Sequence, residues 1–220
     1  MEPDILYEDD ALVVINKPAG IIVHPDGKHD YPALTTWLEK RYKEFYLVHR
    51  IDRETSGVLM VAKTAEAFEF LKSQFKNREI KKTYRAFVYG PLKEARGVID
   101  KPIGSGRGGV GPRSASLPHG TTRDALTTYR VIANGTECAY VEVFPKTGRT
   151  HQIRVHFSSV QHPIVCDSLY APSRPALLGF NRLALHALSL SFTHPSGKEM
   201  SFEAPLPPDF VAAESHLRAV

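Results

Sequence analysis

Residues 49–57, HRIDRETSG, place one carboxylate between two guanidinium groups, because Asp52 lies between Arg50 and Arg53. Nearby positive charge favours the ionised form of a carboxylate. An ionised carboxylate suits a nucleophile or a general base rather than a proton donor. Taken alone, an aspartate among arginines is more often half of a structural ion pair, here with Arg50 or Arg154, than a catalytic group.

Other chemistries find less support in the sequence. A glycosidase needs two carboxylates, one of them kept protonated, and no second acid with such surroundings is evident beside Asp52. Neither GRTH at 148–151 nor ETSG at 54–57 matches the turn that carries a nucleophilic serine. GSGRGG at 104–109 lacks the Lys-Ser/Thr ending of a phosphate-binding loop. The sequence therefore predicts no cofactor.

The histidines and cysteines also fail to form a metal-binding pattern. His151 and His156 are five positions apart, which places them on different faces of a helix. His162, Cys166 and Asp167 are close in sequence but lack the further ligands of a zinc site. We expect structural histidines and no metal.

Basic residues crowd in three segments, 72–85, 107–113 and 146–154, in a chain with a net charge of +4 and a pI of about 9.0. Such groups bind phosphate backbones, although any one of these segments could be a solvated face. The stretch 104–124 is rich in Gly, Ser, Pro and Arg and predicts a long surface loop, which either contacts nucleic acid or is a solvated connector. The charge pattern is compatible with a polyanionic partner.

Composition and length favour one globular domain over residues 1–220, with 42% hydrophobic and 24% charged residues. The longest apolar runs, such as GVLMVA at 57–62, are far shorter than the roughly 20 residues that a membrane-spanning helix needs. Cys138 and Cys166 do not suggest a disulfide framework, and the first residues lack an export signal. We therefore expect a cytoplasmic protein without membrane contact.

Short β-rich runs separated by turn residues predict most of the chain as strands. The predicted strands cover 5–9, 11–18, 20–25, 57–62, 83–90, 97–104, 125–132, 139–145, 183–192 and 199–205. Turns are predicted at 55–57, as Thr-Ser-Gly, and in hairpins at 134–137 and 194–199.

Four segments predict helices: 33–45, 64–77, 150–160 and 207–220. Thr64 and Thr150 are the expected N-caps of the second and third helices. Strands with a few interspersed helices predict an α+β domain with a mixed, largely antiparallel sheet flanked by helices.

Four motifs, taken together, resemble in order and spacing those of the RluA family of pseudouridine synthases. They are HRIDRETSGVLMVAKT at 49–64, KKTYRAFVYG at 81–90, KTGRTHQIRVHFSSVQHPIVCDSLY at 146–170 and LALHALSLSFTHPSGKEMSFEAP at 183–205. The opening LYEDDALVVINKPAGIIVHP also resembles the start of that family's catalytic domain. The resemblance covers most of the chain and departs from the family mainly in Ile51, where members often have Leu, and Cys166, where they often have Gly.

The resemblance implies a fold of the pseudouridine synthase catalytic-domain type and conversion of uridine in RNA to pseudouridine without cofactor or metal. It implies that Asp52 is the catalytic carboxylate, that Tyr84 stacks on the target base and removes the C5 proton, and that Arg154 pairs with Asp52. Arg50 is associated in some members with filling the space left by a flipped nucleotide. The same motifs supply the expected substrate-binding residues His49, Arg50, Arg53, Lys82, Arg149, His151 and Gln152.

The chain resembles members that lack an N-terminal RNA-binding module of the S4 type, so RNA binding is expected from the catalytic domain itself. Either ribosomal or transfer RNA fits the motifs, and a monomer is expected. One alternative is an RNA-binding module of the same fold without activity, but such a module would be free to lose Asp52, Tyr84 and Arg154.

Overall fold

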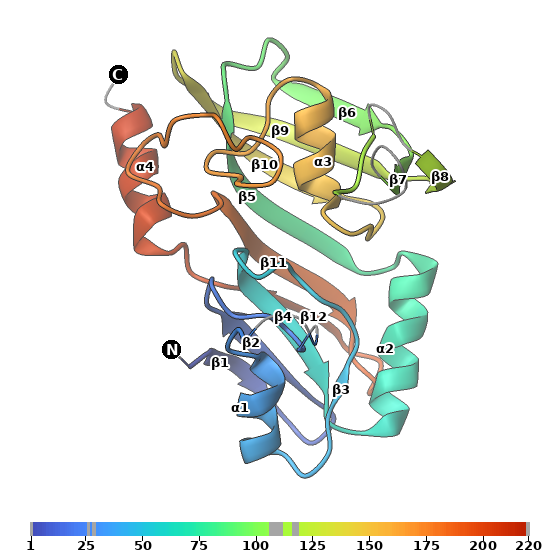
Figure 1. The fold of residues 1–220 in the computed structure, drawn as a ribbon. Coiled ribbons are helices and arrows are strands. Elements are labelled where there is room, and N and C mark those ends of the chain that lie inside the picture. Colours follow the sequence, from blue (N-terminus) through green and yellow to red (C-terminus); the bar gives the residue numbers. More distant parts are fainter. Residues whose placement is uncertain (1, 26, 28–29, 106–111, 116–118, 219–220) are drawn as a thin grey trace. The chain divides into compact units, whose positions relative to one another are not determined.

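The computed structural model describes residues 2–25, 27, 30–105, 112–115 and 119–218. The chain forms two compact units (Figure 1). Unit 1 comprises Met1–Lys82 and His186–Leu206, and unit 2 comprises Thr83–Leu185 and Pro207–Val220. Each unit contains its own strands and helices.

Unit 1 is built on a mixed sheet with the strand order β1-β2-β4-β11, in which β3 also pairs with β4 and β12 with β11. Its strands are β1 (Asp4–Glu8), β2 (Leu12–Lys17), β3 (Tyr46–Leu47), β4 (Ser56–Ala62), β11 (Leu185–Thr193) and β12 (Glu199–Glu203), and its helices are α1 (Leu34–Arg41) and α2 (Ala65–Asn77). Among the strands described for unit 1, β4 pairs in parallel with β11, and the other strand pairs are antiparallel.

The core of unit 1 covers both faces of this sheet. Val14 and Met60 share one core cluster with Leu71 of α2. Val13 and Ile15 alternate with Val14 along β2, so they point to the other face, and they too are fully buried. A strand buried on both faces is a continuous apolar run, which explains LVVI and GVLMVA in the sequence.

Unit 2 contains an antiparallel sheet in the order β5-β10-β9-β6. Its strands are β5 (Lys81–Tyr89), β6 (Arg96–Asp100), β9 (Leu126–Asn134) and β10 (Cys138–Pro145), and β7 (Ile103–Ser105) with β8 (His119–Arg123) forms a separate two-stranded sheet. The helices are α3 (Gln152–Ser159) and α4 (Pro208–Arg218).

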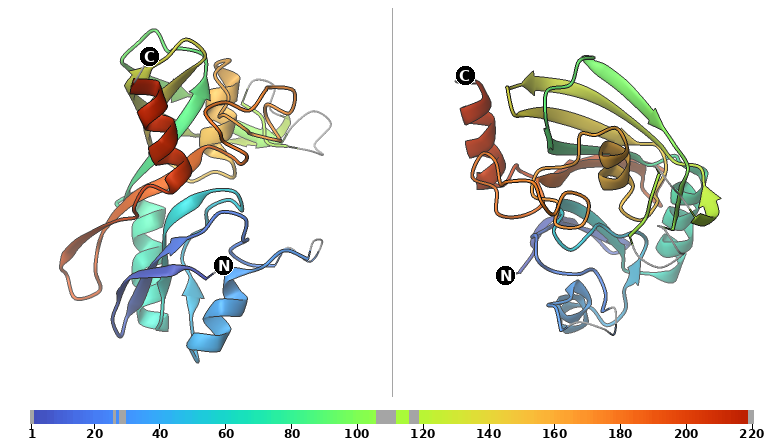
Figure 2. Two further views of the ribbon diagram at one scale, coloured as in Figure 1. Left: turned by 90° about the vertical axis from the view of Figure 1, so that its left-hand side faces the viewer. Right: turned by 45° about the horizontal axis from the view of Figure 1, so that its top comes forward.

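Helices α3 and α4 pack on opposite faces of the four-stranded sheet (Figure 2). Phe157 of α3 contacts Tyr129, with ring centroids 5.4 Å apart, and Phe210 of α4 contacts Phe87 at 5.6 Å. The strand register places Tyr129 and Phe87 on opposite faces, since Tyr129 pairs with Val143 and Phe87 with Tyr140, three positions away on β10.

The predicted α+β class with a mixed, largely antiparallel sheet is confirmed. Both hairpin turns are present, with Gly135 N–H donating to Cys138 O at 2.8 Å and His194 N–H donating to Lys198 O at 2.8 Å. The N-cap Thr64 is also confirmed, because its Oγ1 accepts from Ala67 N–H at 3.2 Å.

Two predicted helices have different ends. The helix predicted over 33–45 ends at Arg41, because the chain turns extended at Tyr42 and then enters β3. The third begins at Gln152, and its N-cap is His151 in the left-handed region (φ 55°) rather than Thr150. The Gln152 side chain accepts from Arg149 N–H at 3.0 Å, so it closes the preceding turn in place of a Thr150 cap.

Three predictions outside the helices are wrong. Segment 20–25 forms an isolated bridge from Ile22 to Ala33 instead of a strand, because its backbone groups bond to Pro32 and to the first residues of α1. Ser56 and Gly57, predicted as a turn, begin β4, since they pair with β11. The predicted loop 104–124 contains β8, where Arg123 pairs with Ile103; Arg107 of that loop lies outside the described residues.

Candidate functional site

Asp52 lies half-buried in the segment that joins β3 to β4. Thr55 N–H donates to Asp52 O at 3.1 Å, which closes a turn over the carboxylate-bearing residue. The next carbonyl, Arg53 O, accepts from Gly20 N–H at 2.9 Å and from Lys17 Nζ at 3.1 Å. The Asp52 turn is therefore attached to the segment that follows β2.

Lys17 is a fully buried cation at the end of β2. Its ammonium group also donates to Pro18 O at 2.8 Å and Ile21 O at 2.9 Å. A buried charge is costly unless it is hydrogen-bonded, so these carbonyls are what make its burial tolerable. Sequence reasoning missed Lys17; a lysine at the end of the apolar run LVVIN, directly before Pro-Ala-Gly, is the signal that could have revealed it.

The His49 side chain makes its contacts within unit 1. Its Nε2 accepts from Met60 N–H at 2.9 Å, and its ring stacks on Phe75 with centroids 4.8 Å apart. Burial, with a smaller contribution from the positive charge of Lys82, lowers the pKa of His49 to about 3, so the ring is neutral near pH 7. This placement gives His49 a structural part, and its predicted contact with substrate stays a prediction.

Other charged residues of unit 1 differ in exposure. Burial lowers the pKa of Lys82 to about 8. Arg53 donates from Nε to Glu54 at 2.6 Å, and its guanidinium carbon lies 4.0 Å from the centre of the Tyr31 ring. Arg50 is exposed. These positions are compatible with the predicted substrate contacts of Lys82, Arg53 and Arg50.

In unit 2, Tyr84 and Arg85 point to opposite faces of the sheet, since they are neighbours on β5. Tyr84 pairs with Val143, so its side chain shares the α3 face, where Tyr129 contacts α3. The Tyr84 ring is half-buried. This combination suits a side chain that presents a ring to a base.

Arg154, in the first turn of α3, forms a bidentate ion pair with Asp167. Nε donates to Oδ2 and Nη2 donates to Oδ1, both at 2.8 Å. Both side chains are buried. The predicted partner of Arg154, Asp52, belongs to unit 1, and that pairing stays a prediction.

The side chain of Gln152 is fully committed to the fold. Its Oε1 accepts from Thr147 Oγ1 at 2.6 Å and from Arg149 N–H, and its Nε2 donates to Leu126 O and Thr127 Oγ1, both at 3.0 Å. These four bonds fill the capacity of an amide side chain. The geometry gives Gln152 a positioning role, and its predicted contact with substrate stays a prediction.

Arg149 and His151 flank this buried amide. Arg149 donates from Nε to Asp124 O at 3.0 Å, and His151 Nδ1 lies 3.0 Å from the hydroxyl of Tyr170. Both side chains are only half-buried, so their predicted contact with RNA fits their exposure.

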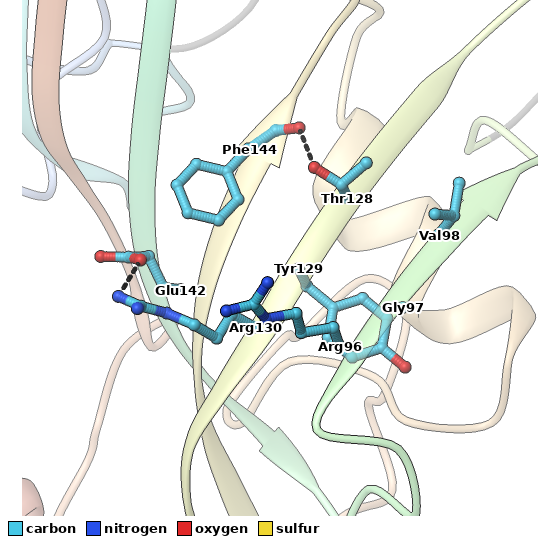
Figure 3. A pocket seen from close by; sticks show the side chains of 8 residues that line it. All are labelled: Arg96, Gly97, Val98, Thr128, Tyr129, Arg130, Glu142 and Phe144. Carbon is cyan, nitrogen blue, oxygen red and sulfur yellow. Dashed lines mark hydrogen bonds and ion pairs between the residues drawn. The ribbon is translucent and has the colours of Figure 1, made fainter.

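A groove of about 480 Å³ lies on the other face of the unit 2 sheet (Figure 3). Arg96, Arg130 and Glu142 pair in one row across β6, β9 and β10, and Arg130 Nη2 donates to Glu142 Oε2 at 2.6 Å. Glu142 also pairs with Arg85 at 3.0 Å. The groove therefore shares the face of Arg85, which is opposite to that of Tyr84.

The described residues contain no helix that is long and apolar enough to cross a membrane. Within the same residues, His, Cys, Asp and Glu side chains form no group of three that could hold a metal ion.

Comparison with known proteins gives one consistent result. A sequence profile described as RNA pseudouridylate synthase matches residues 11–159. The chain is 40% identical to ribosomal large subunit pseudouridine synthase D of Nitrosomonas europaea, over 97% of this chain and 65% of that protein. It is 37% identical to the uncharacterized RNA pseudouridine synthase YlyB of Bacillus subtilis, over 99% of this chain and 74% of that protein.

A solved structure agrees with these relatives. Human RNA pseudouridylate synthase domain containing 4 is 28% identical and superposes with a TM-score of 0.82, over 98% of this chain and 93% of that chain. The chain thus spans nearly all of this human structure but 65% and 74% of the lengths of the two bacterial relatives.

Proposed function

Because the chain belongs to the RNA pseudouridylate synthase family, we propose that it converts uridine to pseudouridine in RNA, with large-subunit ribosomal RNA as its substrate. The family membership that the four motifs predicted is confirmed. The choice of ribosomal over transfer RNA is supported by the name of the Nitrosomonas relative.

One observation carries this proposal: the family match over 11–159 contains Asp52, Tyr84 and Arg154. We assign Asp52 the role of catalytic carboxylate, Tyr84 that of a stacking platform for the target base, and Arg154 that of the partner of Asp52. The family match crosses from unit 1 into unit 2, which supports the prediction that residues 1–220 work as one catalytic domain.

The reaction explains why one carboxylate is sufficient. The N-glycosidic bond breaks, the uracil rotates while bound, and a bond forms between C1′ and C5, after which C5 loses its proton. Asp52 either attacks C1′ or takes a proton from the sugar, and both roles require the anion that a neighbouring guanidinium favours. The Tyr84 oxygen is the proposed acceptor of the C5 proton, and its own hydroxyl proton passes to solvent in the same step.

Substrate access also fits these residues. A uridine inside a duplex or folded loop must leave its stack to reach a carboxylate. An aromatic face gives the flipped base a new stacking partner. Tyr84 lies in the Lys- and Arg-rich strand β5, which begins KKTYR, and such cations suit the RNA backbone.

A non-catalytic RNA-binding module of the same fold is not favoured. The turn that carries Asp52 is fixed through Arg53 O by two donors, Gly20 N–H and Lys17 Nζ. A module that only binds RNA has no need to hold one carboxylate so rigidly.

The test is to map pseudouridines in ribosomal RNA from cells with and without this protein, and to restore the missing site with purified protein in EDTA. We expect one or more pseudouridines to disappear and to return in vitro without added metal. Unchanged maps would contradict the proposed activity, and a requirement for a divalent ion would contradict the cofactor-free reaction.

A monomeric state and a cytoplasmic location also belong to this proposal. Both rest on the sequence, and light scattering of the purified protein and fractionation of cells test them separately.

A further inference from the structure

A carboxylate outside the predicted site residues holds Arg154. Asp167 is 1% exposed, and its two oxygens receive the Nε and Nη2 donors of Arg154, each at 2.8 Å. Two parallel charge-assisted hydrogen bonds fix the plane of a guanidinium group as well as its position. Asp167 therefore determines how Arg154 is oriented.

Asp167 is itself held in a tight turn. Its Oδ1 accepts from the backbone N–H groups of Leu169 and Tyr170, each at 3.0 Å. Its own N–H donates to Ile164 O at 3.2 Å, and its carbonyl accepts from Ala171 N–H at 2.8 Å. The Asp167 carboxylate cannot move without breaking this turn, so its position in the ion pair with Arg154 is fixed.

Tyr170 supports the same guanidinium from its face. The carbon at the centre of the Arg154 guanidinium lies 5.2 Å from the ring centroid of Tyr170. The hydroxyl of Tyr170 is in turn 3.0 Å from Nδ1 of His151, the N-cap of α3. Asp167 holds the backbone N–H of Tyr170. The Tyr170 ring in turn connects the Arg154 guanidinium to His151 at the start of α3.

We infer that Asp167 is a positioning residue for the proposed reaction. It engages two of the five N–H donors of Arg154 and so fixes the plane and position in which the guanidinium presents its other N–H groups. This inference rests on the proposed function, in which those other N–H groups of Arg154 serve the Asp52 carboxylate. Asp167 touches neither substrate nor reacting atoms and acts only through Arg154.

The test measures kcat and KM for pseudouridine formation in the wild type, Asp167→Asn, Arg154→Lys and the double variant. In Asp167→Asn an amide NH₂ group faces the Nε–H of Arg154. Two donors then face each other, so the bidentate hydrogen bonding of Arg154 is lost. Since small displacements of aligned groups cost up to about 100-fold in rate, we expect kcat to fall about 10- to 100-fold. KM should change less than about twofold, because RNA binding is not affected.

The double variant separates positioning from a general structural role. If Asp167 acts through Arg154, adding Asp167→Asn to Arg154→Lys should lower kcat less than about threefold further. Independent effects that multiply in the double variant would overturn the inference, as would a loss that appears in KM alone.

Asp209→Asn is the matched control, because Asp209 forms the same fork with Arg182 in unit 2, at 2.7 Å to Nε and 2.9 Å to Nη2. This control should keep wild-type kcat, and an equal kcat loss in both Asn variants would overturn the inference. Asp167→Glu, which keeps the charge, replaces Asp167→Asn if the latter does not fold, and wild-type kcat in that variant would also overturn the inference.

The proposed function and this inference fail in different ways. A wild-type protein that makes no pseudouridine contradicts the proposed function. An active wild type and an inactive Asp52→Asn, together with wild-type kcat in Asp167→Asn, contradict only the role of Asp167.

Discussion

Two buried charged residues fix the segments that carry the proposed catalytic side chains. Lys17 binds Arg53 O next to Asp52, and Asp167 binds the guanidinium of Arg154. Neither charge would be tolerated in a core without these hydrogen bonds. At the scale of single residues, the proposed active groups therefore depend on partners that lie in other parts of the sequence.

Tyr84→Phe should separate two roles of one ring. The phenyl ring keeps its stacking face, so binding of substrate RNA should persist, whereas turnover should fall because the proposed acceptor of the C5 proton is gone. Tyr84→Ala should in addition weaken binding by roughly 1 to 3 kcal/mol, the contribution of one stacked base. Filter binding and single-turnover rates measure the two effects, and equal turnover in Tyr84→Phe and wild type would remove the hydroxyl from the mechanism.

His49 should make the stability of the protein dependent on acid. Its folded pKa of about 3 lies below the ordinary value of 6.5, so between these values the unfolded chain binds a proton that the folded chain does not. The contribution of His49 is therefore fully present above pH 6.5 and is lost as the pH falls towards 3.

The variant His49→Gln tests this dependence, because an amide oxygen can still accept from Met60 N–H but does not titrate. Its free energy of unfolding, measured by urea denaturation, should change less between pH 6.5 and 3 than that of the wild type. The exposed His216→Gln is the control and should follow the wild type. Parallel profiles of His49→Gln and wild type would show that His49 does not cause the dependence.

At the scale of elements, β4 connects the Asp52 turn to the sheet of unit 1. Its first residues, Ser56 and Gly57, pair in parallel with His186 and Ala187 of β11. The hydroxyl of Ser56 lies 2.9 Å from Nδ1 of His186, which adds a buried side-chain contact to the pairing. The start of β4 thus sets where the Asp52 turn ends.

Gly57→Ala should disrupt this pairing. A Cβ at Gly57 would clash with the backbone carbonyl of Ala187, and the φ of +113° at Gly57 disfavours any side chain. We expect a loss of more than about 2 kcal/mol of folding free energy, together with reduced activity. In the control Gly179→Ala, φ is +76° but nothing lies within 4 Å, so the loss should stay near 1 to 2 kcal/mol. Equal melting temperatures for the two variants would contradict this account.

The sequence predicted most elements because their signals are local. The apolar run of β4 and the Thr64 cap of α2 need no distant partner to be recognised. The start of α3 was missed because Gln152, a residue inside the helix, closes the preceding turn. Asp167 and Lys17 were missed because each acts on a residue far away in the sequence. Asp167 binds Arg154, 13 positions away, and Lys17 binds Arg53, 36 positions away. The periodicity of a sequence gives no information about such contacts.

At the scale of the whole molecule, positive charge is spread over several segments of the sequence, as expected for an RNA partner. The groove with Arg96 and Arg130 adds two cations on the sheet face opposite to that of Tyr84. The affinity for an RNA that reaches Tyr84 should therefore depend little on Arg96 and Arg130 and more on basic residues elsewhere.

Binding of substrate RNA should weaken steeply with added salt. Replacing Arg107 and Arg113 by alanine should reduce the slope of log K against log salt by up to about two phosphate contacts. The matched control is Arg96→Ala/Arg130→Ala, which removes the same charge from the face opposite to Tyr84 and should change the slope less. If the Arg107/Arg113 slope equals that of the wild type, RNA contact must be assigned to residues 72–85 and 146–154 instead.

The central claim is that Asp52 performs the chemistry, and release of tritium from uridine labelled at C5 in substrate RNA tests it most directly. Asp52→Asn removes the charge but keeps the shape of the side chain, so folding and RNA affinity should match those of the wild type. Tritium release should fall by at least about 10²- to 10⁴-fold, the contribution of a key catalytic group. Release by Asp52→Asn at a rate close to that of the wild type would contradict the account.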